Sequence, residues 1–181
     1  VLQALPRTLT GKQVSAMRRQ GKLPAVIYGH NVEATPIVLD LREASKQLSG
    51  LTPSTLVYVA LEGKEHAALV REKQRDFIRN TYIHVDFQAV SLKEKIRAGI
   101  MVELTGVSPA VKEFNAIISN GASSVQVEGL PQDLPELLVV DLSVLKNIGD
   151  VIRVKDLDIP TNITILSDLE EMVVQASAPH A

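Results

Sequence analysis

Residues 81–87 read Thr-Tyr-Ile-His-Val-Asp-Phe, a run in which apolar and polar side chains alternate. Successive side chains of a β-strand point to opposite faces of its sheet, so this period of two predicts a strand. One face would carry Thr81, Ile83, Val85 and Phe87. The other face would carry Tyr82, His84 and Asp86. This strand is expected to bury its apolar face and to present a polar face.

The same period of two recurs through the first half of the chain. Apolar extended stretches at 35–41, 55–61 and 66–70 predict further strands. The Glu62-Gly63-Lys64 triplet lies between the last two of them and is typical of a hairpin turn.

Two short helices are expected to interrupt these strands, at residues 11–20 and 41–48. In front of the first helix, Thr10 with Gln13 three residues later has the pattern of a capping box. Gly21 follows where the end of a helix favours glycine.

The second half has strand signals of its own. From Ile96 to Leu104 every second residue is apolar. Further apolar runs, separated by Pro and Gly, lie at 125–127, 137–142, 151–154, 163–166 and 172–176. Short strands at this spacing predict a second, β-rich domain. The expected fold class is therefore mainly β with short helices (α+β).

The charge changes sign between the two halves. Residues 1–93 hold 13 Lys and Arg against 8 Asp and Glu, whereas residues 94–181 hold 6 against 13. We therefore place the domain boundary here, giving predicted domains 1–92 and 93–181. A basic half joined to an acidic half indicates that the first domain meets a polyanion. The alternative is a solvated surface whose charge is merely uneven.

Composition excludes several classes of protein. The chain has no Cys, which rules out disulfides and cysteine-ligated zinc and fits a reducing compartment. Neither an apolar run of about 20 residues nor a signal-peptide pattern is visible, so a soluble protein without a membrane partner is expected. The P-loop and the Rossmann fingerprint are also absent, and no cofactor, metal or small-molecule substrate is expected.

The predicted first helix has a basic face. At 100° per residue Lys12, Ser15 and Arg19 share one side, Arg18 flanks it, and Val14 and Met17 lie opposite. The first 32 residues contain no acidic residue. Guanidinium and ammonium groups suit phosphate oxygens, so this face favours nucleic acid over an ordinary amphipathic surface helix.

A second group of charges lies at 71–79, where four basic residues accompany two acidic ones. Ion pairs along a strand edge explain this stretch as well as RNA contact does.

His84 and Asp86 allow three interpretations. A catalytic pair would need a nucleophile or a metal, and the sequence has no G-x-S-x-G, no Cys and no H-E-x-x-H. In nucleic-acid recognition the carboxylate would accept hydrogen bonds from base N–H groups such as cytosine N4. The third interpretation is a local His–Asp hydrogen bond on a solvated face.

Two longer stretches of the chain resemble a known family. The run from Arg7 through Gly11-Lys12 to Ser15-Ala-Met-Arg-Arg-Gln-Gly-Lys-Leu-Pro-Ala-Val-Ile-Tyr-Gly29 and the later His84-Val-Asp-Phe87 resemble a bacterial family. It is the family of large-subunit ribosomal proteins that bind 5S rRNA, in the two-domain form called general stress protein CTC. Leu130-Pro-Gln-Asp-Leu-Pro-Glu136 matches its second domain, where Phe114-Asn115 replaces the usual Gly-Gly.

The resemblance implies a six-stranded N-terminal β-barrel, like the anticodon-binding domain of glutaminyl-tRNA synthetase, and a β-rich C-terminal domain. It implies a non-enzymatic protein of the cytoplasmic ribosome, whose partners are 5S rRNA, neighbouring large-subunit rRNA and ribosomal proteins. The implied RNA contacts are Arg7, Lys12, Ser15, Arg18, Arg19, Tyr28, Gln74, Arg79, His84 and Asp86, and Lys22 joins them as a predicted phosphate contact. The alternative is a stress-response adaptor whose acidic second domain binds a protein.

Overall fold

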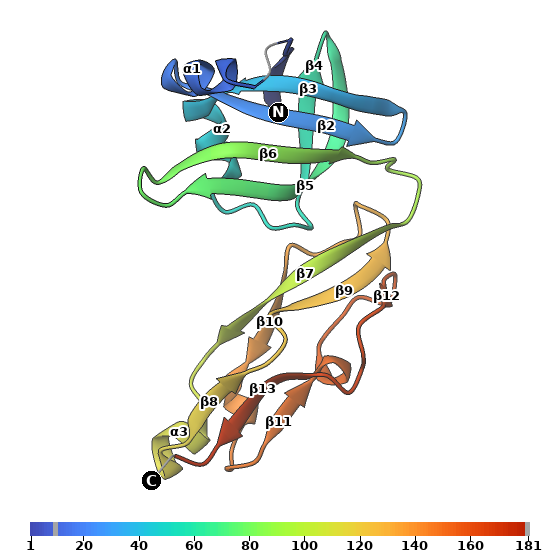
Figure 1. Ribbon diagram of the computed structural model, residues 1–181. Coiled ribbons are helices and arrows are strands. Elements are labelled where there is room, and N and C mark those ends of the chain that lie inside the picture. The colour runs from blue at the N-terminus through green and yellow to red at the C-terminus, as the bar shows by residue number, and fades with distance from the viewer. Residues whose placement is uncertain (9–10, 180–181) are drawn as a thin grey trace. The chain divides into compact units, whose positions relative to one another are not determined.

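The fold is described from a computed structural model, which describes residues 1–8 and 11–179. The chain divides into two compact units, Val1–Lys95 and Ile96–Ala181 (Figure 1). Each is built mainly of β-strands, so the predicted fold class is confirmed.

Six strands of the N-terminal unit close into a barrel in the order β1-β3-β2-β6-β5-β4. The strands are β1 Leu2–Pro6, β2 Lys22–Gly29, β3 Val32–Asp40, β4 Leu56–Leu61, β5 Lys64–Asp76 and β6 Thr81–Ala89. Two neighbouring pairs, β1 with β4 and β2 with β6, run parallel, and the other pairs are antiparallel. The predicted hairpin turn joins β4 to β5, with positive φ at Glu62 and Gly63.

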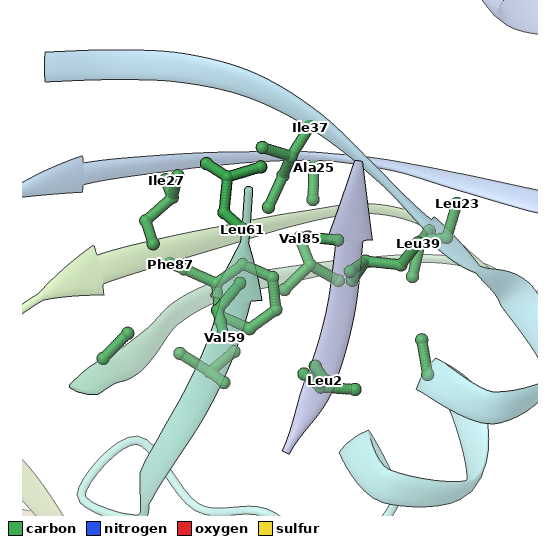
Figure 2. Close-up of a cluster of buried hydrophobic side chains, with 14 of the residues drawn as sticks. Leu2, Leu23, Ala25, Ile27, Ile37, Leu39, Val59, Leu61, Val85 and Phe87 are labelled. Atoms are coloured by element: carbon green, nitrogen blue, oxygen red, sulfur yellow. The ribbon is translucent and has the colours of Figure 1, made fainter. Parts of the chain in front are cut away.

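The barrel interior is aliphatic around one aromatic ring. Figure 2 shows side chains from several strands converging on Phe87, whose side chain is fully buried. Alternate residues of β2, namely Leu23, Ala25 and Ile27, are likewise buried, as the period of two requires. The core therefore fixes which face of β2 and of the inner part of β6 points outward.

Two short helices accompany the barrel, α1 Gln13–Arg19 and α2 Leu41–Leu48. Asp40 caps α2 by accepting hydrogen bonds from the backbone N–H groups of Arg42 and Glu43, both at 3.0 Å. Helix α1 ends before Gly21, whose φ is +75°, as predicted for a glycine that follows a helix. The predicted Thr10 cap lies outside the described residues.

The β5–β6 hairpin contains two bulges, and these correct one prediction. The register shifts between Val70 and Glu72 of β5. It shifts again further along the hairpin, because Gln74 is paired with His84 but the next residue, Arg75, is paired with Tyr82. The second shift leaves Ile83 as an extra residue in β6, which reverses the alternation beyond it. Tyr82 consequently packs against the barrel core, so its predicted place on one face with His84 is wrong.

Gly29 is needed where β2 ends beside β6. Its φ is +124°, and a Cβ at this position would lie 2.5 Å from the carbonyl oxygen of Ala89. A side chain here would therefore push apart two strands that the barrel pairs in parallel.

The C-terminal unit forms two open sheets. The first has the order β10-β7-β9-β12 and the second the order β11-β13-β8. The strands are β7 Ile96–Thr105, β8 Ile117–Asn120, β9 Ser124–Gly129, β10 Leu137–Asp141, β11 Val151–Arg153, β12 Thr164–Ile165 and β13 Met172–Ser177. Short 3-10 turns follow β10 and β11, at Leu142–Val144 and Val154–Asp156.

Strand β8 and helix α3 Pro109–Phe114 of this unit were not predicted from the sequence. The helix ends at Asn115, which has the left-handed conformation with φ 51°. Asn tolerates this conformation better than most residues, so the chain can turn here without a glycine. Among the described residues, no helix has the length and apolar character needed to cross a membrane.

Candidate nucleic-acid interface

Helix α1 presents its basic side to solvent. Met17 is buried and Val14 is half-buried, whereas Lys12, Ser15 and Arg19 are exposed, as the helical period predicted. The helix packs on β2. Its last turn holds Arg18 and Arg19, whose positive charges suit the negative end of the helix dipole.

A groove of about 630 Å³ lies beside α1, against the far end of the β5–β6 hairpin. Three arginines line it, Arg18 and Arg19 from α1 and Arg79 from the turn between the strands. Ser15 lines the same groove, and Asp76 contributes its one carboxylate. This arginine groove, as we call it, has the charge and donor groups that phosphate oxygens require.

Arg18 also joins the helix to the hairpin. Its Nε donates a hydrogen bond of 3.1 Å to the carbonyl oxygen of Ile83, the extra residue of the β6 bulge. A bulged residue drops out of the strand ladder, which leaves its carbonyl available to a side chain. The bulge therefore positions α1 against β6 and keeps the arginine groove in shape.

Asp76 is held by the backbone of the turn. Its Oδ1 accepts hydrogen bonds from the N–H groups of Ile78 at 2.9 Å and Arg79 at 3.1 Å. The carboxylate thereby fixes the backbone of Arg79 at the edge of the groove, and two local donors offset its negative charge.

His84 and Asp86 lie on the outer face of β6 and contact each other. Nδ1 of His84 is 2.8 Å from Oδ1 of Asp86, and both side chains are about one-quarter exposed, at 26% and 27%. With Nδ1–H donated to the carboxylate, the imidazole has a fixed orientation and keeps Nε2 for a second partner.

Neighbouring strands extend this pair into a row of polar side chains. Gln74 of β5 is paired with His84, and its amide donates to Glu72, which is paired with Asp86. On the other side of β6, Tyr28 of β2 is paired with Gln88. Gln88 lies two residues after Asp86, so both side chains are on the same face of β6, and Tyr28 points to this outer face as well. We call Tyr28, Gln74, His84 and Asp86 the polar row.

The structure thus gathers eight of the eleven predicted residues into two adjoining groups, the arginine groove and the polar row. The other three lie apart. Lys12 is the N-cap residue of α1, and Lys22 lies on the other side of that helix, beside Gln20. Arg7 is half-buried after β1, where its backbone N–H donates to the carbonyl of Pro36 at 2.9 Å.

Three of the four basic residues at 71–79 are engaged within the protein. Arg71 donates to the side chain of Gln88, and Lys73 donates to the carbonyl of Leu51 at 2.7 Å. Partial burial lowers the pKa of Lys73. The guanidinium of Arg75 lies over the ring of Tyr82, 5.6 Å from its centroid. Only Arg79 of the four lines the groove, so local contacts explain most of this stretch.

The anchoring roles of Asp76 and Ile83 were not predicted from the sequence. Asp favours turns because its carboxylate accepts hydrogen bonds from the backbone that follows, and the Asp at position 76 could have indicated a turn there. Nothing in the alternating pattern of β6 indicates a bulge at Ile83.

Comparisons with known proteins show the family of this chain. Residues 2–87 match the Ribosomal L25p family, and residues 95–180 match the ribosomal protein TL5, C-terminal domain family. The large ribosomal subunit protein bL25 of Carboxydothermus hydrogenoformans is 40% identical over 162 residues, 89% of this chain and 80% of that protein. This chain belongs to the bL25 family.

Other bL25 proteins match over nearly all of the chain. The protein of Caldanaerobacter subterraneus is 35% identical, covering 98% of this chain and 89% of its own length. That of Pelotomaculum thermopropionicum is 37% identical, covering 98% and 86%. The resemblance noted from the sequence is confirmed. Since bL25 proteins are structural components of the large ribosomal subunit and not enzymes, His84 and Asp86 do not form a catalytic pair.

Proposed function

We propose that the N-terminal unit of this bL25 protein binds 5S rRNA. The observation that carries the proposal is the arginine groove beside the polar row, on a unit with 14 basic and 9 acidic residues. The groove suits the RNA backbone, and the polar row offers donors and acceptors to base edges. The comparisons give no support to the alternative of a stress-response adaptor.

The phosphate contacts come from α1 and the β5–β6 turn. Arg19 and Arg79 present guanidinium groups at the groove, and Lys12 adds an ammonium group at the start of the helix. Arg18 has a double role, because its Nε holds the bulge while the residue also lines the groove. Arg7 and Lys22 lie further from the groove and add charge to the same unit.

The polar row supplies the sequence-dependent contacts. A carboxylate on a face that meets RNA is repelled by phosphates, so Asp86 has a different partner. Its carboxylate accepts N–H donors from bases, while the hydrogen bond from His84 holds it in place. Tyr28 and Gln74 border the pair and contact the same groove of the RNA.

We further propose that the two units act as separate domains, divided near residues 92–95. The C-terminal unit has 5 basic and 12 acidic residues, which disfavours direct contact with an RNA backbone. Its partners would be other parts of the large subunit, namely ribosomal proteins and rRNA that neighbour it.

A salt titration of 5S rRNA binding by the full-length protein tests the proposal. If three to five phosphates are neutralised, log K should fall with log[salt] at a slope of about −3 to −4.5. An affinity indifferent to salt, or equal for 5S rRNA and an unrelated RNA duplex, would contradict it.

Substitutions in the polar row separate base contact from charge. Asp86→Asn and His84→Ala should each weaken 5S rRNA binding by about 1–3 kcal/mol, with the salt slope unchanged. Glu65→Gln removes an equal charge from an exposed position of β5 and is the matched control. Simple repulsion would make both carboxylate variants bind more tightly, so tighter binding by Asp86→Asn would eliminate the base contact.

A further inference from the structure

The turn between β5 and β6 exposes two large apolar side chains. Phe77 is 89% exposed and Ile78 is 97% exposed, more than any other large apolar side chain of the described residues. The chain has only three phenylalanines, and one of them, Phe87, is the centre of the barrel core. Because Phe77 and Ile78 are adjacent, they form an exposed apolar patch, and such patches often mark a binding site.

The backbone of this turn is well anchored. The two hydrogen bonds to the carboxylate of Asp76 hold Ile78 and Arg79, and Asn80 takes the left-handed conformation with φ 55°. The turn thus presents Phe77 from a fixed support, and a partner that binds it has little backbone entropy to remove.

The surroundings of Phe77 are basic. Arg79, two residues away, lines the groove with Arg18 and Arg19, and Figure 1 shows the turn at the same end of the barrel as α1. Arg75 precedes the turn, lying over the ring of Tyr82. A ring beside guanidinium groups is the combination that holds an unstacked RNA base and its phosphate together.

We propose that Phe77 stacks on an unstacked base of 5S rRNA, while Ile78 packs against the adjoining ribose. This inference rests on the proposed function. It adds a stacking contact with a base to the phosphate contacts of the arginine groove and the hydrogen bonds of the polar row. A protein partner fits less well, because two side chains flanked by arginines make a small apolar patch, whereas stable protein interfaces bury roughly 800 Å² on each partner.

The absence of Trp from the chain allows a direct test in the full-length protein. Phe77→Trp introduces a single indole at the turn, and stacking on a base should quench its fluorescence when 5S rRNA is added. Phe114→Trp is the matched control, since Phe114 is 48% exposed in the C-terminal unit. Quenching at Phe77 without quenching at Phe114 supports the stack. If 5S rRNA binds and the indole at position 77 is unaffected, the stack does not form.

Affinity measurements give a second readout. Phe77→Ala should weaken 5S rRNA binding about 5- to 100-fold, with the salt slope unchanged, while Phe77→Tyr should bind like the parent. Phe77→Leu keeps apolar volume without an aromatic face and should bind nearly as weakly as the alanine variant.

Each outcome bears on a different claim. Parent-like binding by Phe77→Leu replaces the stack with a general apolar contact and overturns the inference. Normal binding of free 5S rRNA by Phe77→Ala, with impaired assembly into large subunits, assigns the tip to a ribosomal protein instead and also overturns it. If the parent does not bind 5S rRNA, the proposed function fails as well. Thermal unfolding of each variant verifies that the exposed substitution leaves the barrel folded.

Discussion

The two units arrange their β-strands differently. The N-terminal unit closes six strands into one barrel, and two bulges bend its β5–β6 hairpin. The C-terminal unit leaves its strands in two open sheets, of four and three strands. Closure removes free sheet edges. It also gives the strands a single core, and this core fixes which residues of each strand point outward. The barrel can therefore hold a constellation of polar residues in defined positions.

Charge follows the same division. The barrel unit has an excess of five basic residues, and the C-terminal unit has an excess of seven acidic ones. Basic side chains of the barrel line an open groove, whereas Arg153 and Lys155 of the other unit are both engaged by Glu170. The difference between the units is therefore not only one of net charge: the three groove arginines have no ion pair with a carboxylate among the described residues, and they mark the proposed RNA face.

The largest effect that we expect tests the rigidity of the barrel. Gly29→Ala should lower the free energy of unfolding of the N-terminal unit by about 2–4 kcal/mol, because a Cβ there meets the Ala89 carbonyl. Hydrogen exchange of the barrel amides measures this unit separately.

Gly149→Ala is the matched control in the C-terminal unit. Gly149 has φ +99° and open space around its Cβ position, so only backbone strain of about 1–2 kcal/mol should appear. Equal losses for the two variants would mean that close packing of β2 on β6 does not distinguish the barrel.

The next prediction sharpens the contrast in charge. Arg19→Ala should weaken 5S rRNA binding by about 1–3 kcal/mol and flatten the salt slope by about one, because one phosphate contact is lost. Arg153→Ala removes the same charge from the C-terminal unit, where the guanidinium is 2.7 Å from Glu170. Comparable losses for both variants, measured by the same salt titration, would show that the effect is one of net charge.

The smallest effect concerns the acid sensitivity of the C-terminal unit. Hydrogen bonding from Lys155 and the charges of Lys155 and Arg153 hold the pKa of Glu170 below its usual 4.5. Its stabilising contribution is therefore complete above the unfolded-state pKa and is lost as the pH falls through the lower, folded-state value.

Between about pH 6 and about pH 3, the parent should consequently lose slightly more stability than Glu170→Gln does. Urea unfolding at several pH values checks this, with Glu113→Gln as the control at an exposed helical position. A larger loss of stability on acidification in Glu170→Gln than in the parent would contradict this prediction.

Much of the barrel could be predicted from the sequence because its signals are local. The period of two in β6, the Glu62-Gly63 turn and helix α2 each depend on neighbouring residues, whereas strands β1 and β2 were not predicted. Strand β8 was missed because it is only four residues long, and its pairing with β13 is more than 50 residues away. The closure of the barrel came from family resemblance, since parallel pairs such as β2 with β6 leave no local signal.

The candidate site was predictable to the extent that it follows helix and strand periods. Those periods placed Ser15 and Arg19 together, and His84 with Asp86. They could not place Tyr82, because a bulge depends on the register between two strands. Nor could they show that Lys73 is engaged by a backbone carbonyl, which depends on a loop 22 residues earlier.

The central claim is that the N-terminal unit alone carries the affinity for 5S rRNA. The most direct measurement is the binding of 5S rRNA to residues 1–95, to residues 96–181 and to the full chain across one salt series, with circular dichroism to verify folding. The account predicts that 1–95 binds within about tenfold of the full chain and with the same salt slope, and that 96–181 does not bind. Equal binding by the two fragments, or binding by 96–181 alone, would contradict it.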